Sequence, residues 1–407
     1  MEPTPAVAGF SCPDCGPVSS PTPTDRCPDC DSVLSIANDD AESRPDHLAE
    51  AYDDQRRFAR YLPFDPATVI SLGEGATPLV DAPSVAADLD VDRVLIKDEG
   101  RNPTGSVVDR GLSLAITAAN QRGTETVVLP TTGHGGQSAA AYAGRAGLDS
   151  RSFVPTRSSH LTKAMVNVHG GDMQVVEGRY PDAVEAFEAW IAERKADEAG
   201  EGERSADDEE GDRADPWVAV DAGSPFRKAG AKLLVHELAA TLDWKLPDAI
   251  VVPTGHGVAL AGAHAAIEEL RANGRIDAVP KLVAAQAEGC APIVRAIEGG
   301  HGDWEQPDTI AGSIEIAAPA RGQEAVAAVR ETDGEGVAVP DDALLANAVD
   351  ETAATGLEIS LAGGTGLAGA RRLADAFDVD DTVVVINPLS GSKESDVLRS
   401  ELMSRGQ

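Results

Sequence analysis

Residues 97–111 read KDEGRNPTGSVVDRG, and this stretch decides the fold of the chain. It follows the apolar run RVLI at 93–96 and leads into an Ala- and Leu-rich segment. The pattern therefore predicts a buried strand, a tight turn and a helix that begins after Asp109. The Asn, Pro, Thr, Gly and Ser of the link are typical turn residues.

The same alternation of a short apolar run and a helix-like stretch recurs along the chain. Further strands are expected in TVVLPTTG (126–133), SRSFVPT (150–156), MQVVEG (173–178), DAIVVPTG (248–255), KLVAAQAEG (281–289) and TVVVINPLSG (382–391). Helices are expected from about Ser138 to Ala146 and from about Leu161. Continuous apolar strands that alternate with helices predict a parallel α/β architecture with both sheet faces covered.

Glycine-rich turns follow several of these strands, at 102–106, 131–138, 253–257 and 390–392. Ligands of parallel α/β proteins bind beyond the carboxyl ends of the strands. Glycines let backbone N–H groups approach an anion, and a helix that starts there adds the positive end of its dipole. The turns together predict one crevice for a phosphate- or carboxylate-bearing ligand, although each alone is also what a tight strand-to-helix connection needs.

Four cysteines stand near the start of the chain in two Cys-Pro-Asp-Cys segments, with eleven residues between them. This spacing favours a structural zinc site built from Cys12, Cys15, Cys27 and Cys30, because four thiolates complete a tetrahedron. A disulfide pair and an iron-sulfur cluster are the alternatives. Cys290 stands apart and is expected to be a buried, inert thiol.

The segments divide the chain into three parts. Residues 1–35 are expected to form the zinc ribbon, and 36–70 a linker with a helix over Asp46–Tyr61. Residues 71–407 are expected to form an α/β domain. Within that domain, 193–215 holds eleven acidic and four basic residues and is expected to be a solvated, disordered insertion.

Composition narrows the function of the chain. Its 407 residues carry a net charge of −34, which repels phosphate backbones and anionic membranes, so nucleic acid and membrane partners are not expected. No apolar stretch is long enough to span a membrane and no signal peptide is visible, so a cytoplasmic protein is expected. Only eight of its 34 basic residues are lysines, and the excess of acids indicates adaptation to concentrated salt.

Residues 97–111 resemble the signature of the threonine synthases, in the tryptophan-synthase β-subunit-like (fold type II) family of pyridoxal-phosphate enzymes. The resemblance continues through AQAEGCAPI (285–293), TIAGSI (309–314), Gly356-Leu357 and Ser390-Gly391, and thus covers nearly the whole chain. It implies two α/β lobes over residues 71–407, the smaller one spanning about 112–220, with pyridoxal phosphate in the cleft between them. Cysteine segments are also common at the front of this family, and its members are often dimers.

The residues that would hold the cofactor depart from the family pattern. The family's Ser-Phe-Lys-Asp-Arg is SVVDR here, so Val108 occupies the position of the lysine that forms the Schiff base. A valine can neither form an imine nor carry a proton. His134 takes the place of the asparagine that meets the cofactor ring. The phosphate cradle corresponds to Gly255, His256, Gly257, Val258 and Ala259, and the Glu-Pro-x-Ser segment to 360–363.

Ser390 alone fits its family position, where a hydroxyl meets the pyridine nitrogen. Lys97 and Lys393 are the two candidates for a replacement amine. Lys97 is matched in the family as a structural residue and is expected to point away from the cleft. Lys393 lies beside the Ser390 turn. His134 and His256 are expected in facing loops, either as an acid/base pair or metal site, or as loop histidines bonded to backbone.

Two functions follow from this pattern. The first is a threonine synthase-like protein whose chemistry is degenerate and which binds a small amino-acid-like or phosphorylated ligand, or partners an active relative. The second is an active pyridoxal-phosphate-dependent enzyme that uses a different lysine, either a threonine synthase, which converts O-phosphohomoserine and water to threonine and phosphate, or a related serine/threonine lyase. The first function is favoured, because the residues that differ from the family pattern are concentrated in the cleft.

Overall fold

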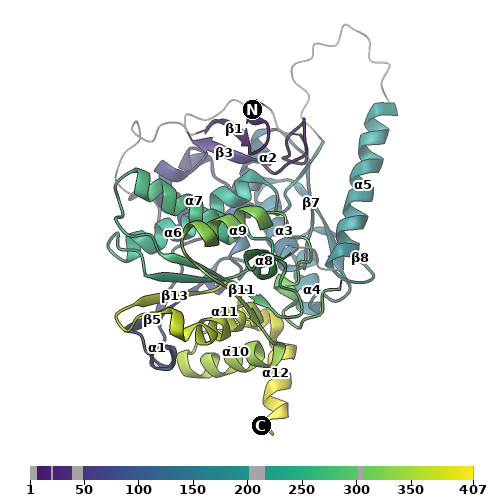
Figure 1. Cartoon of the computed structure of the whole chain (residues 1–407). Helices are drawn as coiled ribbons and strands as arrows, with labels where there is room; N and C mark the ends of the chain where they lie inside the picture. The colour runs from purple at the N-terminus through teal and green to yellow at the C-terminus, as the bar shows by residue number, and fades with distance from the viewer. Residues whose placement is uncertain (1–6, 20–21, 39–48, 201–215, 301–305, 407) are drawn as a thin grey trace.

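The computed structural model describes residues 7–19, 22–38, 49–200, 216–300 and 306–406, and they form three sheets covered by helices (Figure 1). All seven predicted strands are confirmed, and so is the parallel α/β class. No helix in the described ranges is long and apolar enough to cross a membrane.

The large sheet has six strands in the order β12-β11-β10-β13-β5-β4. Its strands are β4 (Leu79–Asp81), β5 (Arg93–Asp98), β10 (Ala249–Pro253), β11 (Lys281–Ala287), β12 (Gly336–Val339) and β13 (Thr382–Asn387). All pairs are parallel except the edge pair β4–β5. The central strands are apolar on both faces because helices cover both.

Helices pack on each face of this sheet. One face holds α1 (Pro83–Leu89), α10 (Asp341–Thr355) and α11 (Leu361–Arg372), and α12 (Ser395–Ser404) follows at the end of the chain. The other face holds α2 (Val108–Gln121), α6 (Pro225–Thr241), α7 (Val258–Ala272), α8 (Pro292–Ile297) and α9 (Gly322–Glu331). Figure 1 shows the two layers above and below the strands.

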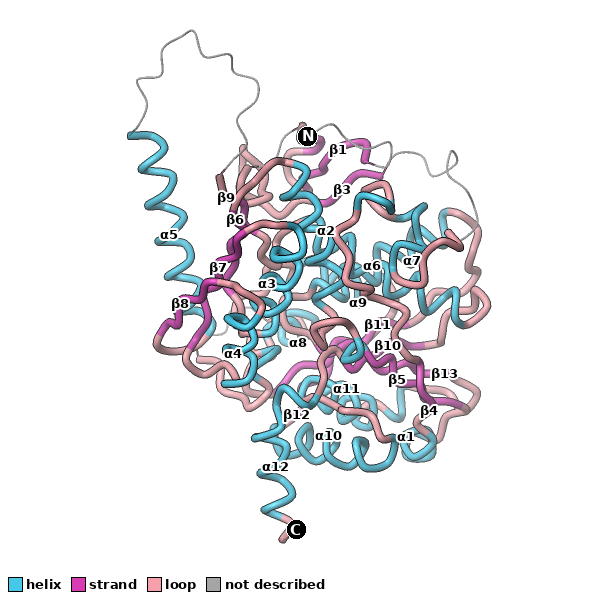
Figure 2. The backbone as a smooth tube through the Cα atoms, turned by 180° about the vertical axis from the view of Figure 1, so that it is seen from behind, coloured by secondary structure: helices cyan, strands magenta, loops and turns pink. Residues whose placement is uncertain are grey.

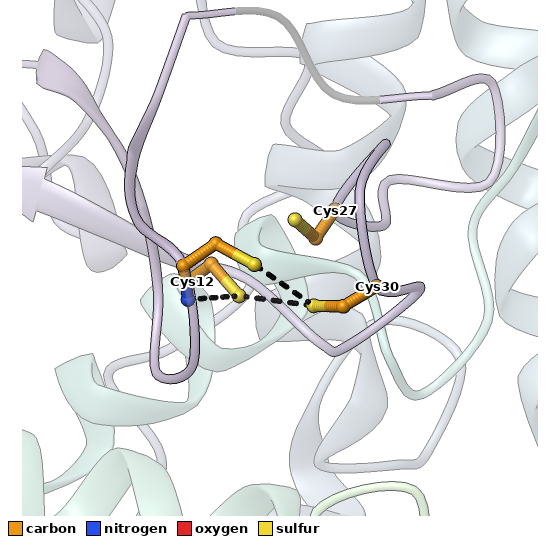
Figure 3. Close-up of side chains that lie close together, drawn as sticks. Cys12, Cys27 and Cys30 are labelled. Atoms are coloured by element: carbon orange, nitrogen blue, oxygen red, sulfur yellow. Dashed lines mark hydrogen bonds between the residues drawn. The ribbon is translucent and has the colours of Figure 1, made fainter.

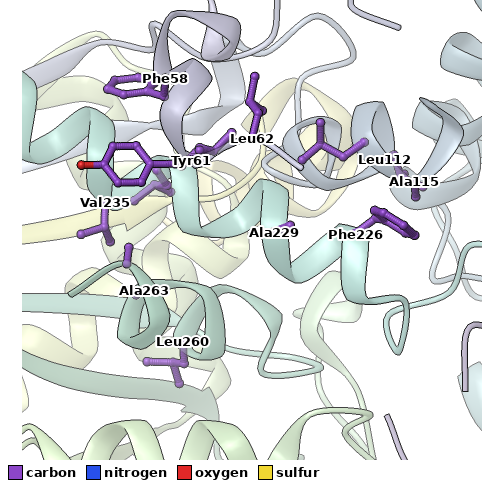
Figure 4. Close-up of a cluster of buried hydrophobic side chains, with 14 of the residues drawn as sticks. Phe58, Tyr61, Leu62, Leu112, Ala115, Phe226, Ala229, Val235, Leu260 and Ala263 are labelled. Atoms are coloured by element: carbon purple, nitrogen blue, oxygen red, sulfur yellow. The ribbon is translucent and has the colours of Figure 1, made fainter. Parts of the chain in front are cut away.

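The second face forms the main hydrophobic core. Figure 4 shows Phe226 and Val235 of α6 among Leu112 of α2, Leu260 of α7 and Phe58. All five side chains are almost fully buried. Full burial of one such side chain stabilises the fold by about 1.5–3 kcal/mol, so this layer fixes α6 against its neighbours.

The small sheet has four parallel strands in the order β8-β7-β6-β9. They are β6 (Thr126–Pro130), β7 (Asp149–Pro155), β8 (Asp172–Val176) and β9 (Trp217–Ala219), and α3 (His134–Ala146), α4 (His160–Val168) and α5 (Tyr180–Gly200) connect them. In Figures 1 and 2, α5 projects from the body.

Two local predictions need correction. Residues 193–200, expected to be disordered, form the last turns of α5. Their sequence is rich in Ala and Glu and continues the helix that starts at Tyr180. Residues 201–215 lie outside the described residues. The helix expected over Asp46–Tyr61 is a 3₁₀ helix, η2 (Gln55–Tyr61), capped by Asp54 and broken at Phe58, and 46–48 lie outside the described residues.

Helix α3 starts at His134 rather than at about Ser138 as predicted. Gly135 and Gly136 lie within its first turn, where a Cβ atom on either would come within 2.8 Å of the Thr131 or Ser152 hydroxyl oxygen. These glycines serve close helix-to-strand packing, and the turn is shorter than their number indicates.

A three-stranded antiparallel sheet stands at the N-terminal end, in the order β2-β1-β3. Its strands are β1 (Val7–Cys12), β2 (Gly16–Val18) and β3 (Ser35–Asn38). This ribbon reaches Asn38, three residues beyond the predicted boundary, and its Phe10 ring packs edge-on against Phe226, with ring centroids 6.0 Å apart. The ribbon therefore shares the main core.

Candidate functional site

The four N-terminal cysteines converge on one point (Figure 3). Their sulfur atoms all lie within 4.8 Å of one another, and Cys30 Sγ is 3.5 Å from Cys12 Sγ and 3.4 Å from Cys15 Sγ. A tetrahedral zinc site with Zn–S bonds of about 2.3 Å needs sulfur separations of roughly 3.8 Å. The donor set thus fits a structural zinc ion with no open coordination position. Cys290 lies elsewhere, 1% exposed, and burial raises the pKa of its thiol to about 12.

The stretch at 97–111 forms a buried ion network at the end of β5 and the start of α2. Arg110 Nε donates to Glu99 Oε2 over 2.7 Å, and Arg110 Nη1 donates to Glu237 Oε2 of α6 over 3.0 Å. Lys97 also pairs with Glu237. Although burial alone would raise it, the pKa of the Glu237 carboxyl is lowered to about 2 by Arg110 and Lys97. Lys97 is thus a structural residue and lines neither cavity described below.

Two glycines bring α2 and α6 unusually close. A Cβ atom on Gly111 would lie 2.7 Å from the carbonyl oxygen of Arg227, and one on Gly230 would lie 2.1 Å from that of Arg110. Neither position admits a larger residue. This contact places the start of α2, with Val108, beside the start of α6, with Arg227.

An inner cavity of about 120 Å³ lies between the lobes at the carboxyl ends of β6 and β10. It brings together seven of the predicted site residues: Val108, His134, Gly255, His256, Gly257, Val258 and Ala259. Ala362 of the 360–363 segment also lines it. Two of the four glycine-rich turns of the predicted crevice, 131–138 and 253–257, thus meet at this cavity, whereas no residue of 102–106 or 390–392 lines it.

The N-terminus of α7 faces this cavity. Gly257 precedes the helix with φ +82°, and a Cβ atom there would lie 2.8 Å from the Arg321 carbonyl oxygen, so this turn requires glycine. No side chain caps the helix. The first-turn N–H groups of Val258 and Ala259 are therefore available to an anion, and the helix dipole favours negative charge there.

Arg227 is the functional residue that sequence reasoning missed. Its side chain lines the inner cavity and the residue is 9% exposed. It forms no hydrogen bond through its guanidinium and no ion pair with any described residue, whereas the buried Arg110 and Arg321 are both paired. The carboxylate of Asp221 attracts it from beyond ion-pair distance and itself lies 3.6 Å from Arg26. A buried, unpaired guanidinium beside a helix N-terminus is suited to an anionic ligand. The signal available in the sequence was its place in the SPFRK segment, at the start of a helix after β9.

His134 and His256 both line the inner cavity. Burial lowers the pKa of each imidazole to about 3, and the charges of Lys393 and Arg227 near His134, and of Arg227 near His256, lower it further. Both rings are thus neutral near pH 7. His256 Nδ1 accepts a long 3.4 Å hydrogen bond from Ala320 N, and its ring contacts Tyr180 edge-on. Neither histidine belongs to a group of three or more metal-ligating side chains in the described residues.

The structure does not bring Ser390 to the cavity wall. Its hydroxyl is engaged by Glu358 and Ser392, and the neighbouring Leu389 lines the inner cavity in its place. The antiparallel bridge between Ile359 and Ser390 holds the hydroxyl toward Glu358.

An outer cavity of about 410 Å³ adjoins the inner one and shares Thr132, His134, Ser313 and Leu389 with it. Lys393 and Glu394 lie on its wall. Burial raises the pKa of the Glu394 carboxyl to about 7, although Leu361 N donates to it over 2.8 Å. Lys393 Nζ donates to Gln137 Oε1 of α3 over 2.6 Å.

The crevice fits part of what pyridoxal phosphate needs. The amides of α7 and the guanidinium of Arg227 would hold a phosphate group, and His134 would lie beside the ring. Position 108 offers no amine, because the side chain at the wall is an isopropyl group. When bound, the cofactor supplies an electron sink for carbanions.

These features define a two-lobed α/β protein with an anion-binding crevice between its lobes. The family model described as pyridoxal-phosphate dependent enzyme matches residues 70–388, and the chain belongs to that family.

Known proteins resemble it over most of its length. The threonine synthase of Methanosarcina acetivorans is 29% identical over 88% of this chain and 85% of its own, and that of Synechocystis is 30% identical over 83% and 82%. Among solved structures, a fungal L-serine ammonia-lyase from Rhizomucor miehei matches with a TM-score of 0.64 at 20% identity, covering 80% of this chain and 98% of its own. The chain is a threonine synthase-like member of the family.

Proposed function

We propose that this protein binds a small, phosphate-bearing, amino-acid-like ligand in the crevice and has lost the chemistry of the lysine that its relatives carry at the position of Val108. The observation that carries the binding is Arg227, a buried guanidinium without a partner beside the uncapped N-terminus of α7. An unpaired buried cation is costly in the free protein, and a bound anion removes that cost. The loss of chemistry rests on Val108 at the cavity wall.

Different residues of the crevice bind different parts of the ligand. Arg227 and the α7 amides hold the phosphate, and the neutral imidazoles of His134 and His256 offer hydrogen bonds to uncharged parts of the ligand. The close packing of α2 on α6, which leaves no room for a Cβ atom at Gly111 or Gly230, keeps Arg227 in place.

Calorimetric titration with inorganic phosphate and with O-phosphohomoserine tests binding. A hydrogen-bonded charge pair is worth about 1.5–3 kcal/mol, so Arg227→Met is expected to weaken phosphate binding roughly 10- to 100-fold. Arg399→Met, which removes the same charge from the exposed face of α12, is the matched control and is expected to bind as the unaltered protein does.

Equal affinity in the Arg227→Met and Arg399→Met proteins would overturn the binding proposal. Threonine formation from O-phosphohomoserine by the purified protein would overturn the loss of chemistry and favour the second candidate, an active lyase that uses a different lysine. The observation that favours that candidate is the buried amine of Lys393.

A further inference from the structure

Lys393 is a buried amine without a counter-ion. It lies in the 3₁₀ helix η7 (Gly391–Glu394) and is 8% exposed. Three lysines are buried in the described part of the chain, and the other two, Lys97 and Lys232, each pair with a glutamate. Lys393 Nζ instead donates to the neutral amide oxygen of Gln137 over 2.6 Å. A structural role alone would favour a carboxylate partner, since burying an unpaired ammonium is costly.

The amine lies in the outer cavity, and its stem passes the loop that leads to Val108. Lys393 lines the outer cavity together with His134, which also lines the inner one. A Cβ atom on Gly105 would lie 3.0 Å from Lys393 Cε, so the lysine stem runs along the loop that leads to Val108. Gln137 follows His134 by one turn of α3. The amine thus lies on the wall of the outer cavity, which adjoins the inner cavity at His134.

Burial keeps this amine partly neutral despite the nearby carboxylates. Burial lowers the pKa of Lys393 to about 8, against the attraction of Asp109 on α2 and Glu394 on η7. The other titratable groups that face it are His134 on α3 and His169 at the end of α4, whose pKa values burial and the Lys393 charge both lower. No carboxylate lies within ion-pair distance among the described residues. Near pH 8 a large fraction of the amine is uncharged and nucleophilic.

We propose that Lys393 is the nucleophile of the crevice and forms an imine with the aldehyde group of an anionic ligand bound there. The neutral nitrogen attacks the carbonyl carbon, a C–N bond forms and the C–O bond breaks. Both amine hydrogens leave with the carbonyl oxygen as water, so no oxidant or reductant is needed. This inference rests on the proposed function, because the anion site of the inner cavity would hold the ligand and Lys393 lies on the wall of the adjoining outer cavity.

Reductive trapping tests the assignment directly. The full-length protein is incubated with pyridoxal phosphate at pH 8, reduced with borohydride, digested and mapped by mass spectrometry. The adduct is expected on Lys393, at least about tenfold above any other lysine. It is expected to vanish in Lys393→Arg, which keeps the charge, and to persist in Lys163→Arg. Lys163 is the matched control because it lies on α4 beside the same cavity and its amine is held by the Thr156 carbonyl oxygen.

A second readout needs no cofactor. Competitive acetylation across pH 6–11 is expected to give Lys393 a half-maximal reactivity near pH 8, since burial lowers its pKa to about that value. An adduct spread over surface lysines, an undiminished adduct in Lys393→Arg, or half-maximal reactivity at pH 10 or above would overturn the assignment.

Phosphate calorimetry on the same preparation separates the two proposals. Phosphate binding with no adduct on Lys393 refutes the nucleophile and leaves the binding function standing. Absence of both phosphate binding and the adduct refutes the two together.

Discussion

The hydroxyl of Ser224 donates a 2.7 Å hydrogen bond to Asp25 Oδ2 across 199 residues of sequence, and so joins the crevice to the cysteine ribbon. Asp25 lies two residues before Cys27, and Ser224 immediately precedes α6, the helix that carries Arg227. Arg122 of α2 binds the other oxygen of Asp25 over 2.7 Å. The buried Arg321 adds two bonds, to the carbonyl oxygens of Leu34 and Gly223. The ribbon therefore stabilises the loop that precedes α6 and, through it, the position of Arg227.

Removal of the metal is expected to weaken the contacts between the cysteine ribbon and the loop that precedes α6. The purified protein is expected to contain zinc, and the Cys27→Ser variant is expected to lack it. Because folding of a small metal site is coupled to metal binding, this variant is also expected to have a lower Tm and a weaker affinity for phosphate. Metal analysis, thermal unfolding and calorimetry measure the three effects. Cys290→Ser, which removes a buried thiol outside the cluster, is expected to retain its zinc. Unchanged phosphate affinity in metal-free protein would contradict the coupling.

The ion network around Glu237 makes a second prediction. Glu237→Gln leaves Lys97 and Arg110 buried with one carboxylate, Glu99, and is expected to destabilise the fold by about 3–5 kcal/mol in urea unfolding at pH 7. The Glu237 pKa is about 2 in the folded protein, below its usual 4.5. Its contribution is therefore present above pH 4.5 and is lost as the pH falls toward 2. The exposed Glu298→Gln is the control, and equal stabilities of the two variants would contradict the prediction.

The strands and the crevice loops were predictable because both depend on local pattern. Buried parallel strands are continuous apolar runs. The turns after β6 and β10 contain glycines at positions where a Cβ atom would clash with a neighbouring segment. The cysteine cluster was predictable for the same reason, since each pair of thiolates is fixed by a short turn.

The electrostatics of the site were not predictable. Whether Arg227 is paired depends on which carboxylates reach it from other elements, and no local pattern encodes that. The same holds for Glu237, which lies more than 100 residues from Lys97 and Arg110. The Ser390 hydroxyl turns toward Glu358 because of a bridge between distant segments. Tertiary contacts decide each case.

Glu394 is expected to give a pH-dependent stability. Burial raises its pKa from 4.5 to about 7, so the folded state holds a proton that the unfolded state has released. This contribution is fully present below pH 4.5 and is lost as the pH rises through 7. Glu394→Gln is therefore expected to match the unaltered protein at pH 4 and to be more stable by about 1–2 kcal/mol at pH 8. Denaturant unfolding at both pH values measures this, with the exposed Asp396→Asn as control. A constant difference across pH would refute it.

The net charge of −34 predicts a dependence on salt. Self-repulsion among surface carboxylates is screened over about 10 Å at 0.1 M salt and about 3 Å at 1 M. Tm is therefore expected to rise steeply between about 0.1 and 1 M KCl. Sucrose stabilises folded proteins without screening charge and serves as the control. The same Tm in dilute buffer and in molar KCl would exclude adaptation to salt.

Val108→Lys tests whether the crevice keeps the shape that the family's chemistry needs. Val108 is the first residue of α2 and lines the inner cavity, so a lysine there would point its amine toward the α7 N-terminus. Borohydride reduction with pyridoxal phosphate is expected to label Lys393→Arg protein weakly, and to label the double variant Val108→Lys/Lys393→Arg strongly on the new amine. Val168→Lys/Lys393→Arg, which adds a lysine at a site 72% exposed on α4, is the matched control. Selective labelling at position 108 would mean that the pocket persists and only its amine was lost. Labelling no stronger than at position 168 would mean that the crevice has been reshaped, and that Arg227 serves a ligand unlike the family's cofactor.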